Sequence, residues 1–179
     1  GLTMADQSAN LAESAANAAA VMTVSITEGT ATTVSFLSGN TDGDSDGNLP
    51  FAIATSGAIT VNDADDIDYD TTTSYTLRVV ALDDDDTVSA DITITITDVN
   101  DQTPAVSVSS TYNHAEAAST TWLDFTMVDT DTTGSYDCTL GGDDSADFSK
   151  SVSGKVCTVA WAANPNYEIP VDSGPNNVY

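Results

Sequence analysis

Apolar and polar residues alternate with a period of two through the middle of the chain. Residues 91–98 place every isoleucine on one side of the chain and every threonine on the other, and residues 75–81 alternate in the same way. Because successive side chains of a β-strand point to opposite faces, each run predicts a strand with one buried face. Four consecutive aspartates at 83–86 separate the runs and predict a solvated turn or a metal loop. The two runs are therefore expected to form an antiparallel hairpin.

Shorter apolar runs, bounded by Gly, Asn or Asp, predict further strands on both sides of this hairpin. These strands are expected at residues 21–27, 32–37, 51–54, 58–61, 106–108, 122–128, 136–140 and 156–161. Residues 5–20 are rich in Ala, which favours helix, but they lack an apolar stripe of helical period. We expect strand and loop there. The spacing of these runs is typical of a β-sandwich, with a second sandwich starting near Ala105.

The chain is strongly acidic. Its 179 residues carry 28 Asp and Glu against 3 Lys and Arg, a formal net charge of −25. This charge excludes nucleic acid as a partner, because phosphate binding needs basic side chains, and it disfavours anionic membrane surfaces. No stretch approaches the ~18 apolar residues of a membrane span, and no signal peptide is visible. Of the acidic residues 24 are Asp, which favours turns and calcium loops over helices.

One seven-residue motif has a counterpart in a known family. Residues 98–104, Asp-Val-Asn-Asp-Gln-Thr-Pro, resemble the linker between cadherin repeats, whose pattern is Asp-x-Asn-Asp-x-x-Pro. Ahead of it, residues 56–61, 67–70 and 75–83 resemble the family's Gly-x-Ile, Leu-Asp-Arg/Tyr-Glu and Tyr-x-Leu-x-Val-x-Ala-x-Asp elements, in the family's order. Glu13 takes the place of the early glutamate. The chain therefore resembles the cadherin-like repeats of large bacterial surface proteins.

This resemblance implies an all-β fold of tandem cadherin-like, immunoglobulin-like Greek-key β-sandwiches. It divides the chain into residues 1–103, a repeat with an N-terminal segment, and residues 104–179, a second repeat. Tyr179 aligns with Tyr75, so the second repeat is expected to be incomplete and to lack its final hairpin.

The family resemblance also implies several calcium ions at the linker. The implied ligands are Glu13, Asp68, Asp70, Asp98, Val99, Asn100, Asp101, Gln102, Asp129 and Asp131. Val99 and Gln102 would contribute main-chain carbonyls. Calcium takes six to eight oxygen ligands, and clustered carboxylates need a cation, since like charges ~4 Å apart repel by about 1 kcal/mol even in bulk water. The alternative interpretation is that these aspartates are turn formers and solubilising charges.

Weaker metal candidates lie elsewhere. Glu116, Asn166 and Glu168 match the first-repeat ligands, with Asn in place of one Asp. Asp42, Asp44 and Asp46 reproduce the start of an EF-hand loop, but Ile53 stands where the bidentate Glu belongs, so a polar insertion is the alternative. Asp83 lies where the family binds calcium with a preceding repeat, but residues 25–28 lack the Asp-x-Asp partner. That end is expected to be metal-poor.

The remaining chemistry is sparse. Cys138 and Cys157 are expected to form a disulfide in an oxidising compartment, with two buried thiols as the alternative. Trp122 and Trp161 lie in predicted strands and are expected in the core. His114 is the only histidine and is expected on the surface. No nucleophile, phosphate loop or zinc spacing accompanies it, so we do not expect an enzyme.

Two functional hypotheses follow. In the first, the chain is a calcium-stabilised adhesion module in a bacterial surface protein, a stiff rod of tandem sandwiches that is secreted or held at the cell surface. In the second, it is the subunit of an extracellular filament whose second sandwich is completed by a neighbour's strand, with residues 1–10 as a candidate donor. The expected partners are calcium, further repeats or copies of the chain, and glycans or cell-surface proteins. Nucleic acid and membrane insertion are not expected.

Overall fold

The computed structural model describes residues 1–108, 111–116, 121–172 and 174. The chain divides into two compact units, the first ending at Val99 and the second beginning at Asn100. The first contains strands β1 (Gln7–Ala12), β2 (Ala20–Thr23), β3 (Thr33–Ser38), β4 (Phe51–Ile53), β5 (Ala58–Val61), β6 (Ser74–Leu82) and β7 (Thr87–Thr97). The second contains β8 (Ala105–Val106), β9 (Thr121–Val128), the 3-10 helix η1 (Ser145–Asp147), β10 (Phe148–Ser153) and β11 (Val156–Trp161).

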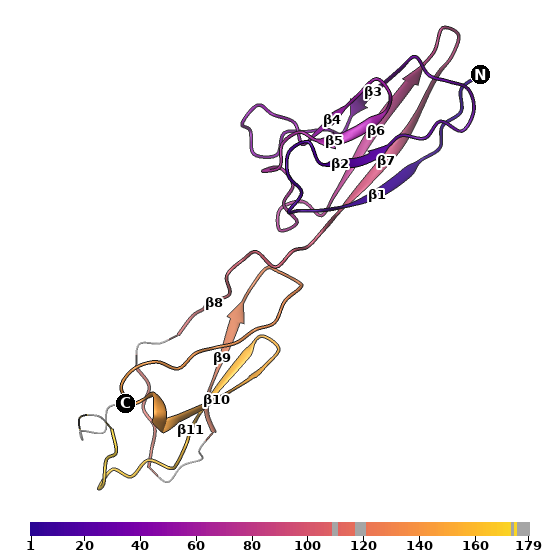
Figure 1. The fold of residues 1–179 in the computed structure, drawn as a ribbon. Helices are drawn as coiled ribbons and strands as arrows, with labels where there is room; N and C mark the ends of the chain where they lie inside the picture. Colours follow the sequence, from indigo (N-terminus) through magenta and orange to yellow (C-terminus); the bar gives the residue numbers. More distant parts are fainter. Residues whose placement is uncertain (109–110, 117–120, 173, 175–179) are drawn as a thin grey trace. The chain divides into compact units, whose positions relative to one another are not determined.

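The first unit is a sandwich of two sheets with the strand orders β1-β7-β6-β3 and β2-β5-β4 (Figure 1). The predicted hairpin forms its longest ladder, in which Leu77 lies opposite Ile92 and Tyr75 opposite Ile94. Leu77, Ile92 and Ile94 have no exposed surface, and they share one core cluster with Ile59 and Val61 of the other sheet. The core therefore lies between the sheets, on the faces that the alternation predicted.

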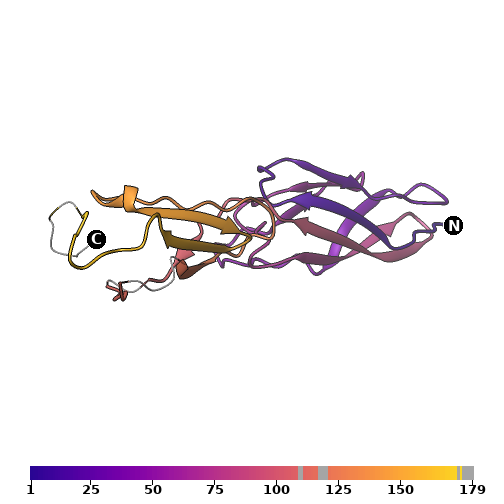
Figure 2. The same cartoon turned by 90° about the horizontal axis from the view of Figure 1, so that it is seen from below.

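The N-terminal segment belongs to the first unit. β1 pairs in parallel with β7, from Gln7 opposite Ile92 to Ala12 opposite Thr97, so the expectation of a strand within residues 5–20 is confirmed. Leu2 is buried, and its amide donates to Asp86 at 3.0 Å in the turn between β6 and β7, beside the N-terminus (Figure 2). Residues 1–10 are therefore held in their own unit, which argues against a donor role.

The strand predicted at 21–27 is shorter than expected and ends at Thr23. The side chain of Gln7 replaces a neighbouring strand there, accepting the Ser25 N–H at 2.8 Å and donating to the Ser25 carbonyl at 3.0 Å. Because a side chain satisfies this main-chain pair, the ladder does not continue.

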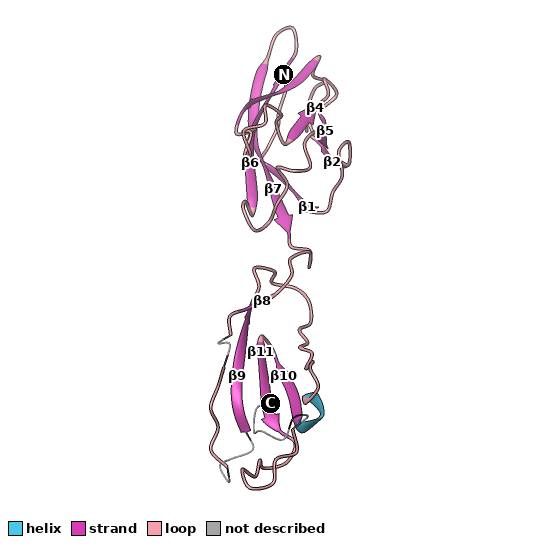
Figure 3. Ribbon diagram, turned by 90° about the vertical axis from the view of Figure 1, so that its left-hand side faces the viewer, coloured by secondary structure: helices cyan, strands magenta, loops and turns pink. Residues whose placement is uncertain are grey.

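The second unit contains one sheet in the described residues, with the order β10-β11-β9-β8 (Figure 3). Its β10-β11-β9 part has the same order as β4-β5-β2 of the first unit.

Trp161 is buried and stacks on Phe148 at 4.4 Å between ring centroids, as expected of a core residue, whereas the side chain of Trp122 lies outside the described residues. His114, expected on the surface, is half-buried, with its ring 5.7 Å from that of Trp161.

The strand predicted at 136–140 is wrong, and β10 was not predicted. Residues 136–140 run without strand pairing, and Lys150 of β10 binds them through the Asp137 carboxylate at 2.6 Å and the Cys138 carbonyl. β10 is polar, but a two-residue connection through Gly154, whose φ is 55°, turns it directly into β11. A glycine at this spacing was the available hairpin signal.

No helix in the described residues is long and apolar enough to cross a bilayer.

Candidate metal centre

The carboxylate of Glu13 accepts hydrogen bonds from two acidic segments of the first unit. It follows the last residue of β1, and its Oε1 accepts the Val99 N–H at 2.5 Å while its Oε2 accepts the Tyr69 N–H at 2.8 Å. Asp98 precedes Val99, and Asp68 and Asp70 flank Tyr69. Glu13 therefore brings together the ligands that the resemblance implies in two other stretches of the first unit, residues 68–70 and Asp98.

The turn that carries Asp68 and Asp70 is internally ordered. Asp68 Oδ1 accepts the Asp70 N–H at 2.9 Å, and its Oδ2 accepts the Thr71 hydroxyl at 2.6 Å. Ile67 is 3% exposed and anchors the turn in the core, while Asp70 is exposed. The turn is thus held by a buried apolar residue, with Asp68 half-buried and Asp70 exposed.

In the second unit the linker is held by Asp131. This residue is 1% exposed, and its Oδ2 accepts the Gln102 N–H at 2.9 Å. Its own amide donates to Asp129 Oδ1 at 3.1 Å, and Lys155 Nζ donates to the Asp129 main-chain carbonyl at 2.7 Å. Burying an ionised carboxylate costs several kcal/mol unless a cation or hydrogen bonds compensate it. Asp101 and Gln102, Asp129 and Asp131 therefore form a second acidic group of implied ligands.

Asn100 has a specific neighbour that the sequence analysis missed. A Cβ added to Gly134 would lie 2.6 Å from Asn100 Nδ2, and Gly134 has a φ of 118°. The backbone conformation favours glycine at this position, and a larger residue would also have to displace the Asn100 side-chain amide. Gly134 follows Asp129 and Asp131 closely in the chain, so it was a detectable companion of that motif.

The second unit repeats the Glu13 arrangement. Glu116 Oε2 accepts the Tyr167 N–H at 2.8 Å, and Asn166 Oδ1 accepts the Glu168 N–H at 2.9 Å. These are the counterparts of the Glu13 to Tyr69 and Asp68 to Asp70 hydrogen bonds. The weaker candidates of the second repeat thus occupy the same local geometry as the first-repeat ligands, with a neutral amide replacing one carboxylate.

The other candidates lie apart from these groups. Asp83 is in the β6–β7 turn, where its Oδ1 accepts the amides of Asp85 and Asp86 at 2.9 and 2.6 Å. Those bonds are typical of an aspartate that stabilises a turn. Asp42, Asp44 and Asp46 gather in the loop between β3 and β4, with one oxygen of each within 4.8 Å of the others.

Cys138 and Cys157 are joined by a disulfide, with their Cα atoms 6.3 Å apart. Cys157 is 3% exposed in β11 and belongs to a small core cluster with Met127 and Val159. The bridge ties the irregular residues 136–140 to the sheet.

No protein-family model matches the chain, and no curated protein matches it. Among solved structures, protocadherin gamma B2 extracellular cadherin domains 3–6 are 25% identical with a TM-score of 0.64, and the match covers 94% of this chain and 40% of that one. The fold is that of cadherin β-sandwiches. The human desmocollin-1 ectodomain has a TM-score of 0.71 at 18% identity, covering 94% and 35% of the two chains. A protocadherin gammaB7 EC3-6 cis-dimer structure matches at 19% identity with a TM-score of 0.66, over 94% and 39%.

These comparisons confirm the predicted all-β, cadherin-like sandwich architecture. This chain spans about 40% of the length of the protocadherin gamma B2 structure that it matches.

Proposed function

We propose that this chain is a calcium-stabilised, extracellular adhesion module of a bacterial surface protein, in which ions bound at linker residues 98–102 stiffen a rod of tandem sandwiches. The observation that carries the proposal is the Glu13 carboxylate, which holds the amides of Val99 and Tyr69 and so gathers the acidic residues beside them. Extracellular cadherin domains with the same fold support the location and the adhesive role.

The chemistry of the implied ligands favours calcium. The set consists of carboxylates, one amide side chain and main-chain carbonyls, and it includes neither His nor Cys. All-oxygen sets suit hard cations, and calcium accepts the larger and more variable number of ligands that such a set provides. The 1% exposed Asp131 adds a reason for binding, because a divalent ion would compensate its desolvated charge.

Self-association and further repeats are the partners that we propose, together with glycans or proteins of another cell surface. A protocadherin of this fold forms a cis-dimer, which supports contacts between copies. The formal charge of −25 is consistent with exclusion of nucleic acid from this list. The role is one of binding and support, without catalysis.

Replacing Asp101 with Ala tests the stiffened joint. In small-angle scattering with millimolar calcium, the Asp101→Ala chain is expected to show a broader and shorter distribution of distances than the wild type. Both units should stay folded, because the first core rests on residues such as Leu77 and Ile92, and Asp101 is exposed. Asp84→Ala, which changes an exposed aspartate in the β6–β7 turn, is the matched control. An unchanged Asp101→Ala profile, or a compact wild type with calcium, would contradict the rod.

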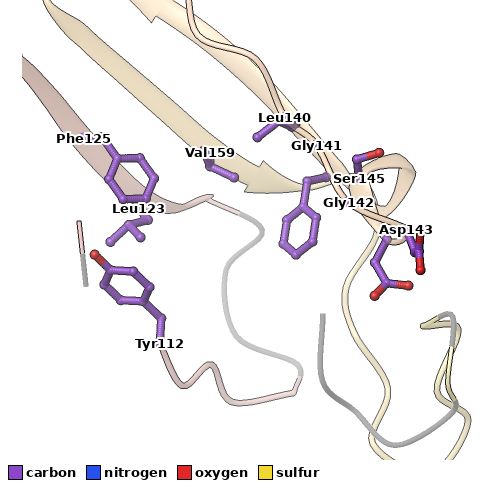
Figure 4. Close-up of a pocket in the computed structure, with 11 residues that line it drawn as sticks. Tyr112, Leu123, Phe125, Leu140, Gly141, Gly142, Asp143, Ser145 and Val159 are labelled. Carbon is purple, nitrogen blue, oxygen red and sulfur yellow. The ribbon is translucent and has the colours of Figure 1, made fainter. Parts of the chain in front are cut away.

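A second candidate function is the filament subunit, and a cavity in the second unit favours it. The cavity has a volume of about 260 Å³ and lies against the β9 and β11 side chains Leu123, Phe125 and Val159 (Figure 4). Tyr112 and Phe148 also line it. In the first unit the sheet containing β6 and β7 covers the corresponding face. A strand supplied by a neighbouring copy would bury this surface, as in β-strand addition.

Sedimentation velocity over a hundredfold concentration range tests this candidate. Strand exchange predicts a sedimentation coefficient that rises with concentration, and Phe125→Glu should abolish the rise by placing a charge in the apolar cavity. Val128→Glu is the control and should leave the rise intact, because Val128 lies three residues further along β9, on the opposite face, and is 66% exposed. A wild type that sediments as a monomer throughout would exclude the filament.

A further inference from the structure

The loop between β3 and β4 is built around Asp42. Its Oδ2 accepts the Gly47 N–H at 2.8 Å and its Oδ1 accepts the Ser45 N–H at 2.6 Å. Asp44 Oδ1 accepts the Asp46 N–H at 3.0 Å. The three carboxylates are thereby folded toward one another, with an oxygen of each within 4.8 Å of the others.

Asp66, distant in sequence, lies against this loop. It is 6% exposed, and its Oδ1 accepts the amides of Gly43 and Asp44 at 2.8 and 3.2 Å. Its Oδ2 is buried and has no hydrogen-bond partner among the residues that the structure describes. The hydroxyl of Tyr75 donates to the Asp66 main-chain carbonyl and holds the residue in place. A nearly fully buried carboxylate with one unsatisfied oxygen therefore lies against the loop that carries the other three.

The loop lacks a basic partner for this charge. The ion pairs of the described residues involve Arg78 with Asp91, Lys150 with Asp137 and the N-terminal ammonium with Asp86, and none reaches the loop. An unsatisfied buried carboxylate oxygen costs free energy that a bound cation would recover.

We propose that residues 42–46, backed by Asp66, form a separate calcium site of the first unit. The position that provides a bidentate Glu in an EF-hand is Ile53, which lies in β4, pairs with Ile59 and packs on the core. Asp66 supplies from another part of the chain the negative charge that this position lacks. With carboxylates from three alternate residues, a buried fourth and open solvent for water ligands, the site fits calcium, in the affinity range of about 10⁻⁴ to 10⁻³ M typical of extracellular modules.

Backbone amide NMR of the full chain, titrated with CaCl₂ alone to about 10 mM, tests the proposal against that affinity range. Saturable shifts are expected at Gly43, Asp44 and Gly47, and they should be lost in Asp44→Asn/Asp46→Asn. The matched control Asp84→Asn/Asp85→Asn removes the same charge from the exposed β6–β7 turn and should keep them. Loop amides that do not move, or that move equally with MgCl₂, would overturn the site.

The variant Asp66→Asn distinguishes a role of Asp66 in calcium binding from a role in holding the loop alone. Asn keeps an acceptor for the Gly43 and Asp44 amides and removes the buried charge. In chelator its melting temperature should equal or exceed that of the wild type, while the saturable loop shifts with CaCl₂ should be lost. Retention of those shifts in folded Asp66→Asn would overturn the role of Asp66. Shifts at residues 98–102 report the linker separately, so this site and the proposed linker ions can fail independently.

Discussion

Removing calcium from the wild-type chain is expected to lower its melting temperature by roughly 10–20 °C for a unit of about 100 residues. A ligand that binds only the folded state adds about 2.7 kcal/mol to the free energy of unfolding at a hundredfold excess over its Kd, and this addition disappears with the ligand. The physical reason is the acidic linker. Asp98, Asp101 and Asp131 belong to groups of like charges that repel one another without a counter-ion, most strongly where water is excluded, as at the buried Asp131.

Calorimetry of the same protein in millimolar calcium and in chelator provides the measurement. Glu13→Gln should reduce the difference between the two conditions, because it removes the charge that lies between the amides of Val99 and Tyr69. Glu28→Gln changes an exposed glutamate of the same unit and should preserve the difference. Identical wild-type curves with and without calcium would contradict both the linker ions and the function that depends on them.

Loss of the Cys138–Cys157 disulfide is expected to destabilise the second unit by about 3 kcal/mol on the chain-entropy model, for a bridge between residues 19 positions apart. The effect should be large in relation to the unit's stability, because its buried cluster is small and centred on Met127, Cys157 and Val159. Without the bridge, residues 136–140 keep the contacts of Lys150, the contacts of Tyr136 with Asp131 and Lys155, and the packing of a few apolar side chains near the sheet.

The measurement is thermal unfolding of Cys138→Ala/Cys157→Ala beside wild type with and without reductant. The transition of the second unit should move down in the variant and in reduced wild type, whereas reductant should have no effect on the variant. The transition of the first unit should stay in place, since its core contains neither cysteine. Two thiols that react with a labelling reagent in denatured, unreduced native protein would contradict the bridge.

Local patterns predicted most strands because the alternation of apolar and polar residues within a strand reflects which of its faces is buried. The alternation of Ile and Thr in β7 reflects one face against a core and one face against solvent, and every Ile of that run is at most 1% exposed. The strand at 136–140 failed for the complementary reason. An apolar run becomes a strand only when a partner offers main-chain hydrogen bonds, and none of the described strands pairs with these residues.

The sequence by itself determined the all-β sandwich, the long hairpin of β6 and β7 and the acidic residues of the linker, because each depends on short-range alternation or on a compact motif. Only the tertiary structure decided which carboxylates meet. Glu13 reaches the Val99 amide across 86 positions, and Asp66 reaches the Gly43 amide across 23. Such contacts depend on how the sheets pack and where loops cross them, and the packing that buries Asp66 arises from apolar residues such as Ile67 and Tyr75 rather than from any pattern among the aspartates.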